Sequence, residues 1–291
     1  MDYNLEYLLN PIKLKQMAEF WINEDLPGFD FQGLIVGEKF ATAEIYLKQS
    51  GILAGVPFVN AILKSVDLQP PVWMKSEGEF IEASTLNRQT IAKIKGPARL
   101  ILLCERTILN VLARCSGVAT KSRSLRSKLD RLNWSGQLVG TRKTTPGFRM
   151  VEKYGLLVGQ IGTHRYDLSS MIMLKDNHVE LSNNQLSKNI RDLKRLAGFS
   201  FRIEVECSKF ETAKLAAESG ADIIMLDNMN PNESVSIIRA LKQEFPMILF
   251  EASGGITEEN IDQYARPEFD IISTSCLVQG YPSIDYSMKI N

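Results

Sequence analysis

Polar residues of types that could do chemistry follow six short apolar segments in the second half of the sequence. In chain order they are Arg142 with Lys143, Lys175, Glu206, Asp227, Ser253-Gly254-Gly255 and Ser273-Thr274-Ser275. Residues just beyond the C-terminal ends of parallel barrel strands share one rim. Each residue alone is typical of an ordinary strand end, but six such positions together indicate a functional site on that rim.

The cations of this set point to an anionic ligand. Between Arg142 and Lys175 there are six Lys or Arg residues against two acids, Glu152 and Asp167, and His164 lies among them. Arginine grips a carboxylate through two parallel hydrogen bonds, and lysine adds a point charge. The cluster therefore favours a ligand that carries more than one negative group.

The acids and the glycine motif fit a metal-assisted reaction on a phosphate. Glu206 and Asp227 follow adjacent predicted strands and could hold one Mg²⁺ through oxygen ligands. The same pair would suit a paired-carboxylate glycosidase site, or salt bridges to nearby lysines, and spacing does not separate these alternatives. Ser253-Gly254-Gly255, before a helix predicted from Thr257, offers backbone N–H groups for a phosphate monoester, although such glycines also make simple turns.

Alternating strand and helix patterns would position these residues. The predicted strands are Gln137 to Thr141, Met171 to Leu174, Phe201 to Val205, Asp222 to Leu226, Ile248 to Ala252 and Asp270 to Ser273. Helices predicted over residues 208–219 and 231–245 and from Thr257 separate the later strands. Such βα units favour a parallel barrel, complete or open, over a flat doubly wound sheet.

The residues before Cys115 have a different pattern. A helix near Leu14 to Trp21 precedes alternating stretches with Gly and Pro between them, which is typical of a separate α+β domain. A helical pattern from Glu105 to Val118 and a charged one from Lys121 to Arg131 connect the two parts.

Composition excludes several classes of protein. The 291 residues carry 34 Lys or Arg against 34 Asp or Glu, so no overall field favours nucleic acid or a membrane surface. The longest apolar stretches fall far short of the roughly 20 residues that cross a bilayer. Four scattered cysteines and two histidines without ligand spacing argue against a disulfide framework or a zinc site. No signal or transit peptide is visible, so we expect a cytoplasmic location, with the nucleus also open.

Several motifs occur together in one order, and their combination is highly specific. They are Glu105-Arg-Thr-Ile-Leu-Asn110, Gly140-Thr-Arg-Lys-Thr-Thr-Pro-Gly147, Glu152-Lys-Tyr154, Thr163-His-Arg-Tyr166, Leu174-Lys-Asp-Asn-His178, Glu204-Val-Glu206, Ile224-Met-Leu-Asp-Asn228, Glu251-Ala-Ser-Gly-Gly-Ile256 and Ser273-Thr-Ser275. From about Asp25 onward the chain resembles the quinolinate phosphoribosyltransferases, most closely their eukaryotic, fungal-like form. The likeness implies an α/β fold: an N-terminal α/β sandwich domain over residues 1–115 and an open seven-stranded α/β barrel over residues 116–276. It also implies a tail, residues 277–291, that returns to the first domain.

The resemblance further implies an activity and a site. Members of the family convert quinolinate and phosphoribosyl pyrophosphate to nicotinate mononucleotide, pyrophosphate and CO₂ in NAD biosynthesis, with Mg²⁺ and no organic cofactor. By likeness, the quinolinate carboxylates would be gripped by Arg142, His164, Arg165 and Lys175. The donor would contact Lys143, Glu206, Asp227, Ser253, Gly254, Gly255, Ser273 and Thr274, with Glu206 and Asp227 also facing the metal. Lys143, Lys175, Glu206 and Asp227 would be catalytic.

The likeness also implies a homodimer or larger homo-oligomer in which Arg106 reaches the quinolinate site of the neighbouring subunit; without it, Arg106 is a plain surface arginine. Two competing functions stay open. One is a phosphoribosyltransferase for a pyridine monocarboxylate, which the pair His164-Arg165 disfavours. The other is a catalytically silent phosphate-binding barrel, which would be expected to lose Lys143, Glu206 or Asp227, and all three are present.

Overall fold

The computed structural model describes residues 3–290, which form two compact units. The first unit comprises the described residues up to Arg123, together with Thr145–Gln160 and the segment from Tyr281. The second comprises Ser124–Thr144 and Ile161–Gly280. The domain boundary predicted at residues 115/116 falls inside one continuous helix, α4 (Ala98–Arg131), which also contains both helical patterns predicted there.

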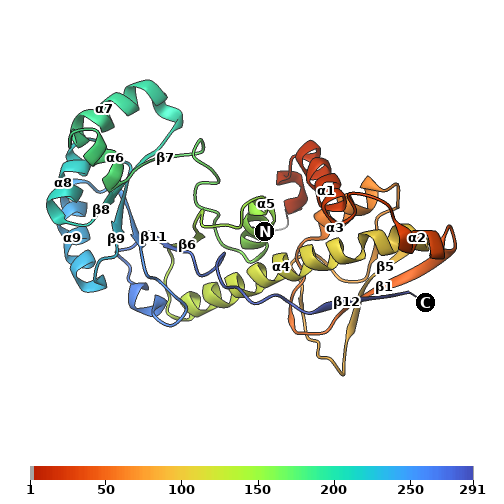
Figure 1. Cartoon of the computed structure of the whole chain (residues 1–291). Helices are drawn as coiled ribbons and strands as arrows, with labels where there is room; N and C mark the ends of the chain where they lie inside the picture. The colour runs from red at the N-terminus through yellow and green to blue at the C-terminus, as the bar shows by residue number, and fades with distance from the viewer. Residues whose placement is uncertain (1–2, 291) are drawn as a thin grey trace. The chain divides into compact units, whose positions relative to one another are not determined.

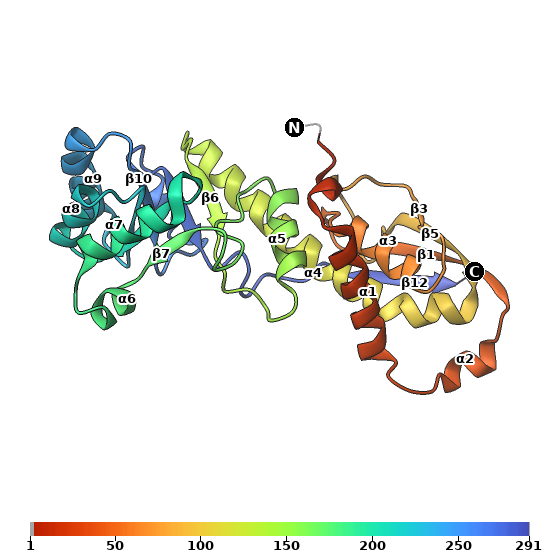
Figure 2. The ribbon, with the colours of Figure 1, turned by 90° about the horizontal axis from the view of Figure 1, so that it is seen from above.

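The first unit is built on an antiparallel sheet of order β12-β1-β5-β3. Its strands are β1 (Phe40–Leu47), β3 (Val72–Trp73), β5 (Gln89–Pro97) and β12 (Tyr286–Ile290). A separate pair joins β2 (Gly51–Ile52) to β4 (Phe80–Ile81). Figure 2 shows β12 beside β1, and the register pairs Ala43 with Ile290 and Leu47 with Tyr286. The end of the described chain thus completes the sheet of the first unit.

Helices accompany this sheet, and several of them bury apolar faces in the core of the first unit. They are the 3₁₀ helix η1 (Leu5–Leu8), α1 (Pro11–Asp25), α2 (Phe31–Val36), α3 (Val56–Ser65), the first part of α4 and α5 (Arg149–Val158). The Asn10 side chain caps α1 by accepting the N–H groups of Ile12 and Lys13. The buried positions Leu14, Ala18 and Trp21 repeat at helical spacing, which sets the face that α1 turns to the core. The helix predicted near Leu14 to Trp21 is confirmed.

The second unit contains a parallel sheet of order β6-β11-β10-β9-β8-β7. Its strands are β6 (Gln137–Gly140), β7 (Ile172–Leu174), β8 (Ile203–Cys207), β9 (Ile223–Asp227), β10 (Leu249–Ser253) and β11 (Ile271–Thr274). All six predicted strands are therefore confirmed. Helices α7 (Leu186–Ala197), α8 (Phe210–Glu218) and α9 (Pro231–Glu244) lie along one side of the sheet (Figure 1), and α6 (Asp176–Leu181) and η2 (Gly198–Ser200) complete this part.

Two expectations for the second unit differ from the structure. In the described residues the seventh strand is reduced to a single parallel bridge between Val139 and Gly162. Gln160 and His164 on either side have positive φ angles of 65° and 54°, which end an extended strand. The helix predicted from Thr257 is a turn followed by the 3₁₀ helix η3 (Ile261–Tyr264), because Asn260 closes the turn by bonding Thr257 N–H and the Gly255 carbonyl. No helix within residues 3–290 has the length and apolar character needed to span a bilayer.

Candidate active site

Eleven of the predicted site residues converge on one cavity of about 370 Å³ in the second unit. They come from the C-terminal ends of the strands and the loops that follow, as the barrel rim predicts. The set is Arg142, Lys143, His164, Arg165, Lys175, Glu206, Asp227, Ser253, Gly254, Gly255 and Ser273. Thr141, Met173, Met225 and Asn228 complete the lining.

Thr274 was also predicted to contact the phosphoribosyl donor, but it does not line the cavity. Its side chain is only 3% exposed. The hydroxyl donates to the carbonyl of Ile256 at 2.5 Å and accepts the N–H of Cys276 at 3.2 Å. It therefore supports the loop after β10, whereas the neighbouring Ser273 faces the cavity and donates to Ser253 Oγ at 3.1 Å.

Two guanidinium groups line this cavity and could bind an anion. Arg165 donates from Nη1 to the carbonyl of Met171 and from Nη2 to Met173 Sδ, each at 3.3 Å. Burial, and then the charge of Arg142, lower the pKa of Arg165 from its ordinary value. Within residues 3–290 the buried Nε of Arg142 has no hydrogen-bond partner. A buried donor next to a second cation costs free energy unless an anion accepts from it.

Lys175 and Glu206 form an ion pair at the same rim. Lys175 Nζ lies 2.6 Å from Glu206 Oε2, because β7 and β8 are paired with Leu174 beside Val205. The salt bridge to a nearby lysine, one of the alternatives left open by the sequence, is thus present for Glu206. A ligand carboxylate that draws Lys175 away would free the Glu206 carboxylate.

Asp227 ends β9, and the next residue holds its side chain. Asn228 Nδ2 donates to Asp227 Oδ2 at 2.5 Å, and the Asn228 N–H donates to the carbonyl of Ser253 at 3.0 Å. Asn228 has a φ of 55° and Gly254 one of 83°, and a Cβ on Gly254 would lie 2.4 Å from Asn228 Oδ1. Sequence reasoning missed Asn228. Its position directly after the candidate acid, in a residue type that tolerates left-handed conformations, is the signal that could have found it.

The expected magnesium site has a suitable donor set. Glu206 and Asp227 offer hard carboxylate oxygens of the kind that Mg²⁺ takes, usually with substrate phosphates and waters completing the shell. Among residues 3–290, Lys175 engages Glu206 Oε2 and Asn228 engages Asp227 Oδ2, which leaves the second oxygen of each acid for a cation. The residues therefore fit the metal.

A cluster that the sequence did not predict as functional lies next to His164. His164 Nε2 is 3.2 Å from Glu251 Oε2 and 3.7 Å from Glu204 Oε2, and both acids are at most 1% exposed. Burial and the charge of Glu251 raise the pKa of Glu204 to about 10. The signal in the sequence is an acid in the middle of a predicted apolar strand, since unpaired carboxylates are rarely buried.

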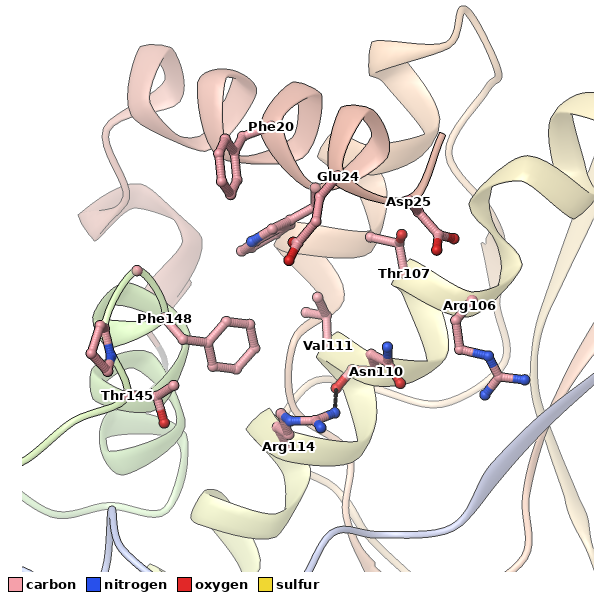
Figure 3. A pocket seen from close by; sticks show the side chains of 13 residues that line it. Phe20, Glu24, Asp25, Arg106, Thr107, Asn110, Val111, Arg114, Thr145 and Phe148 are labelled. Carbon is pink, nitrogen blue, oxygen red and sulfur yellow. Dashed lines mark hydrogen bonds between the residues drawn. The ribbon is translucent and has the colours of Figure 1, made fainter. Parts of the chain in front are cut away.

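Arg106 lies in the first unit, apart from this set. It is exposed on α4 and lines a cavity of about 560 Å³ with Asn110 and Arg114, one and two turns further along the helix. Figure 3 shows this helix face, Glu24 and Asp25 from α1, and Phe148 on the other side of the cavity. Arg114 Nη1 donates to the Asn110 carbonyl at 3.3 Å. Arg106 thus lies on a second cavity, in the first unit, whose lining carries two arginines and the two acids Glu24 and Asp25.

Comparison with known proteins decides the family. Residues 29–116 match the family "Quinolinate phosphoribosyl transferase, N-terminal domain", and residues 118–289 match the corresponding C-terminal domain. The chain belongs to the quinolinate phosphoribosyltransferase family. The resemblance stated from the sequence motifs is thereby confirmed.

Individual family members are similar over nearly the whole chain. The nicotinate-nucleotide pyrophosphorylase [carboxylating] of Rattus norvegicus is 42% identical over 286 residues, covering 98% of this chain and 94% of that protein. The enzyme of the same name from Dictyostelium discoideum is 42% identical over 297 residues, covering 98% of each chain. The solved nicotinate-nucleotide pyrophosphorylase from Francisella tularensis superposes with a TM-score of 0.87 at 27% identity, over 97% of this chain and 98% of that one. The quinolinate phosphoribosyltransferase fold is therefore confirmed for this chain.

Proposed function

We propose that this protein transfers the phosphoribosyl group of phosphoribosyl pyrophosphate to quinolinate, with decarboxylation, and so makes nicotinate mononucleotide, pyrophosphate and CO₂. Family membership and relatives named nicotinate-nucleotide pyrophosphorylase [carboxylating] support this function. The observation that carries it is the pair Arg142 and Arg165, with the buried Nε of Arg142 unpartnered among the described residues and Lys175 on the same cavity. Quinolinate has two adjacent carboxylates that such a pair can neutralise.

The residues divide the chemistry between acceptor and donor. Arg142, Arg165 and Lys175 would hold the carboxylates and aim the pyridine nitrogen at the anomeric carbon of the donor. That nitrogen forms the new C–N bond while the C–O bond to pyrophosphate breaks, and pyrophosphate leaves with the bonding electrons. The positive charge that develops on the ribose is stabilised by the carboxylates of Glu206 and Asp227. Lys143 would stabilise the leaving pyrophosphate.

Decarboxylation uses the product of the transfer. The cationic ring nitrogen withdraws the electron pair released when the bond to the adjacent carboxylate breaks, CO₂ departs, and the ring carbon takes a proton from solvent. The reaction as written needs no organic cofactor. Magnesium held by Glu206 and Asp227 would add positive charge opposite the pyrophosphate oxygens.

The 5′-phosphate of the donor would lie against the loop after β10 and the end of β11. Gly254 and Gly255 have φ angles of 83° and 62° and no side chains, so their backbone N–H groups are unhindered, and Ser253 and Ser273 add hydroxyls. A turn follows this loop, so its N–H and O–H groups, rather than a helix dipole, would bind the phosphate. Thr274 would stabilise the loop after β10 through its hydrogen bond to the Ile256 carbonyl.

The proposal extends to assembly and location. We place the protein in a homodimer or larger homo-oligomer in which Arg106 completes the quinolinate site of the neighbouring subunit, as the family likeness implies. The exposure of Arg106 on a cavity of the first unit supports this role. We also propose a cytoplasmic location, with the nucleus as the alternative. The balanced charge of the chain gives no support for a nucleic-acid or membrane partner.

The deciding experiment compares two acceptors at equal donor concentration. Purified protein with Mg²⁺ and phosphoribosyl pyrophosphate is given quinolinate, labelled in the carboxylate next to nitrogen, or nicotinate. We expect nicotinate mononucleotide and labelled CO₂ from quinolinate, in equal amounts, and little turnover of nicotinate. Equal or faster turnover of nicotinate would instead support an enzyme for a monocarboxylate, and no turnover of either would support a silent phosphate-binding barrel.

A further inference from the structure

Three ligand-type side chains meet behind the cavity surface in the second unit. Among the described residues, His164, Glu204 and Glu251 have nitrogen or carboxylate atoms that all lie within 4.8 Å of one another. His164 lines the cavity, whereas the two acids are inside β8 and β10. Neither Glu204 oxygen accepts a hydrogen bond of ordinary geometry from any described residue.

The hydrogen bonds of His164 fix which ring nitrogen carries the proton. The backbone N–H of Arg165 donates to His164 Nδ1 at 2.6 Å. A nitrogen that accepts cannot itself carry a proton, and a neutral imidazole has one N–H. The proton is therefore on Nε2, which lies 3.3 Å and 3.2 Å from the two oxygens of Glu251. This tautomer has no lone pair on Nε2 for a metal ion, so the cluster is arranged for a hydrogen bond.

The same contacts stabilise an unusual backbone. His164 has a φ of 54°, a left-handed conformation that side chains disfavour unless other contacts hold it. Its ring, bonded at Nε2 and Nδ1, ties this backbone to β10 and to the next residue. That next residue is Arg165, whose guanidinium donates hydrogen bonds to the Met171 carbonyl and to Met173 Sδ. The Arg165 side chain, which lines the cavity, thus starts from a backbone N–H that is bonded to the His164 ring.

We propose that Glu251 is a positioning residue: it accepts the Nε2–H of His164, holds the ring, and through it aims Arg165 at the anionic ligand. The inference rests on the proposed function for the identity of that ligand, quinolinate. Because both ring nitrogens are used within the chain, His164 would act through Arg165, and not by the direct carboxylate contact expected from the family likeness.

Two conservative variants show whether the length of the Glu251 side chain or its negative charge is what His164 requires. Glu251→Gln keeps the length and an acceptor oxygen, whereas Glu251→Asp keeps the charge but is one methylene shorter and does not reach Nε2. We expect Glu251→Asp to raise the KM for quinolinate about tenfold, the loss of roughly one buried hydrogen bond. The KM for the donor should stay near wild type. Glu251→Gln should restore the quinolinate KM to within about threefold of wild type.

The control is Glu258→Asp, the same exchange at an exposed position of the same unit, and it should change neither KM. The proposal is overturned if Glu251→Asp binds quinolinate like wild type, if it raises both KM values equally, or if Glu251→Gln is as impaired as Glu251→Asp.

A second measurement does not depend on turnover. The chain has only two histidines, His164 and His178, so long-range ¹⁵N–¹H spectra of ¹⁵N-histidine protein contain two imidazoles, assigned with His178→Gln. We expect His164 as the Nε2–H tautomer in wild type and Glu251→Gln, and a different or mixed tautomer in Glu251→Asp. An Nδ1–H tautomer in wild type would refute the hydrogen-bond arrangement. If wild type did not use quinolinate, the proposed function would fail while these spectra still decided the role of Glu251 toward His164.

Discussion

Replacing Arg165 by alanine should weaken the binding of quinolinate far more than that of the donor. Of the five N–H groups of the guanidinium, one donates to Met171 and one to Met173, which leaves three for a ligand as far as the described part of the chain is concerned. A bidentate, charge-assisted contact from these groups contributes about 2–3 kcal/mol, which corresponds to a roughly 30- to 150-fold increase in Kd on its loss. Arg165→Lys, which keeps the charge but not the planar fork, should lose about tenfold.

Calorimetric titration of each variant with quinolinate, and separately with phosphoribosyl pyrophosphate, measures both constants. Arg202→Ala removes an exposed cation that does not line the cavity and is the matched control. Nicotinate serves as a comparison ligand that lacks one carboxylate and should lose less affinity than quinolinate. An unchanged Kd for quinolinate in Arg165→Ala, or an equal loss for quinolinate and the donor, would refute the assignment of Arg165 to the carboxylate site.

Three further predictions concern the metal, the assembly and the phosphate loop. Turnover should vanish in excess chelator and return with Mg²⁺ alone, because Glu206 and Asp227 provide hard oxygen ligands; full turnover without a divalent ion would contradict this. Arg106→Ala and Lys175→Ala chains should each be inactive, and reassembled mixtures should recover part of the activity, since one site of a mixed dimer would be intact; no recovery despite proven subunit exchange would contradict a role of Arg106 in the partner's site. Gly254→Ala should cost about 1–3 kcal/mol in the free energy of unfolding and raise the KM for the donor, because its φ is 83° and the new Cβ would meet Asn228; denaturant titration and kinetics that match wild type would show that the loop tolerates a side chain.

Much of the site was predictable because strand ends have a simple geometry. The residue that follows a strand of a parallel sheet lies on a rim shared with the other strands. The positions of the apolar segments in the sequence were therefore enough to predict that Arg142, Lys175, Glu206 and Asp227 line one cavity. The individual roles of neighbours depend on which way a side chain turns. Ser273 and Thr274 are adjacent and chemically similar, yet one lines the cavity and the other bonds Ile256 inside the loop.

The remaining differences come from contacts between residues distant in sequence. The acids that follow Thr257 are typical of a helix start, but the Asn260 side chain closes a turn there. The sequence near Gly162 does not reveal that Gln160 and His164 take left-handed conformations on either side. The partner of His164 Nε2 is Glu251, 87 residues further along the chain, and only the folded sheet brings the two together.

The route of the chain through the first unit has a consequence for its synthesis. Strand β12 pairs with β1 only after every residue of the second unit has been translated, and Tyr286 on β12 reaches Ser116 through a 2.8 Å hydrogen bond between their hydroxyls. Until then β1 has an unpaired edge on a ribosome-bound chain, and such an edge can pair with other nascent strands. The second unit, whose chain is contiguous except for Thr145–Gln160, can close earlier. In cells the first unit, although it begins the chain, would therefore be the last to complete its sheet.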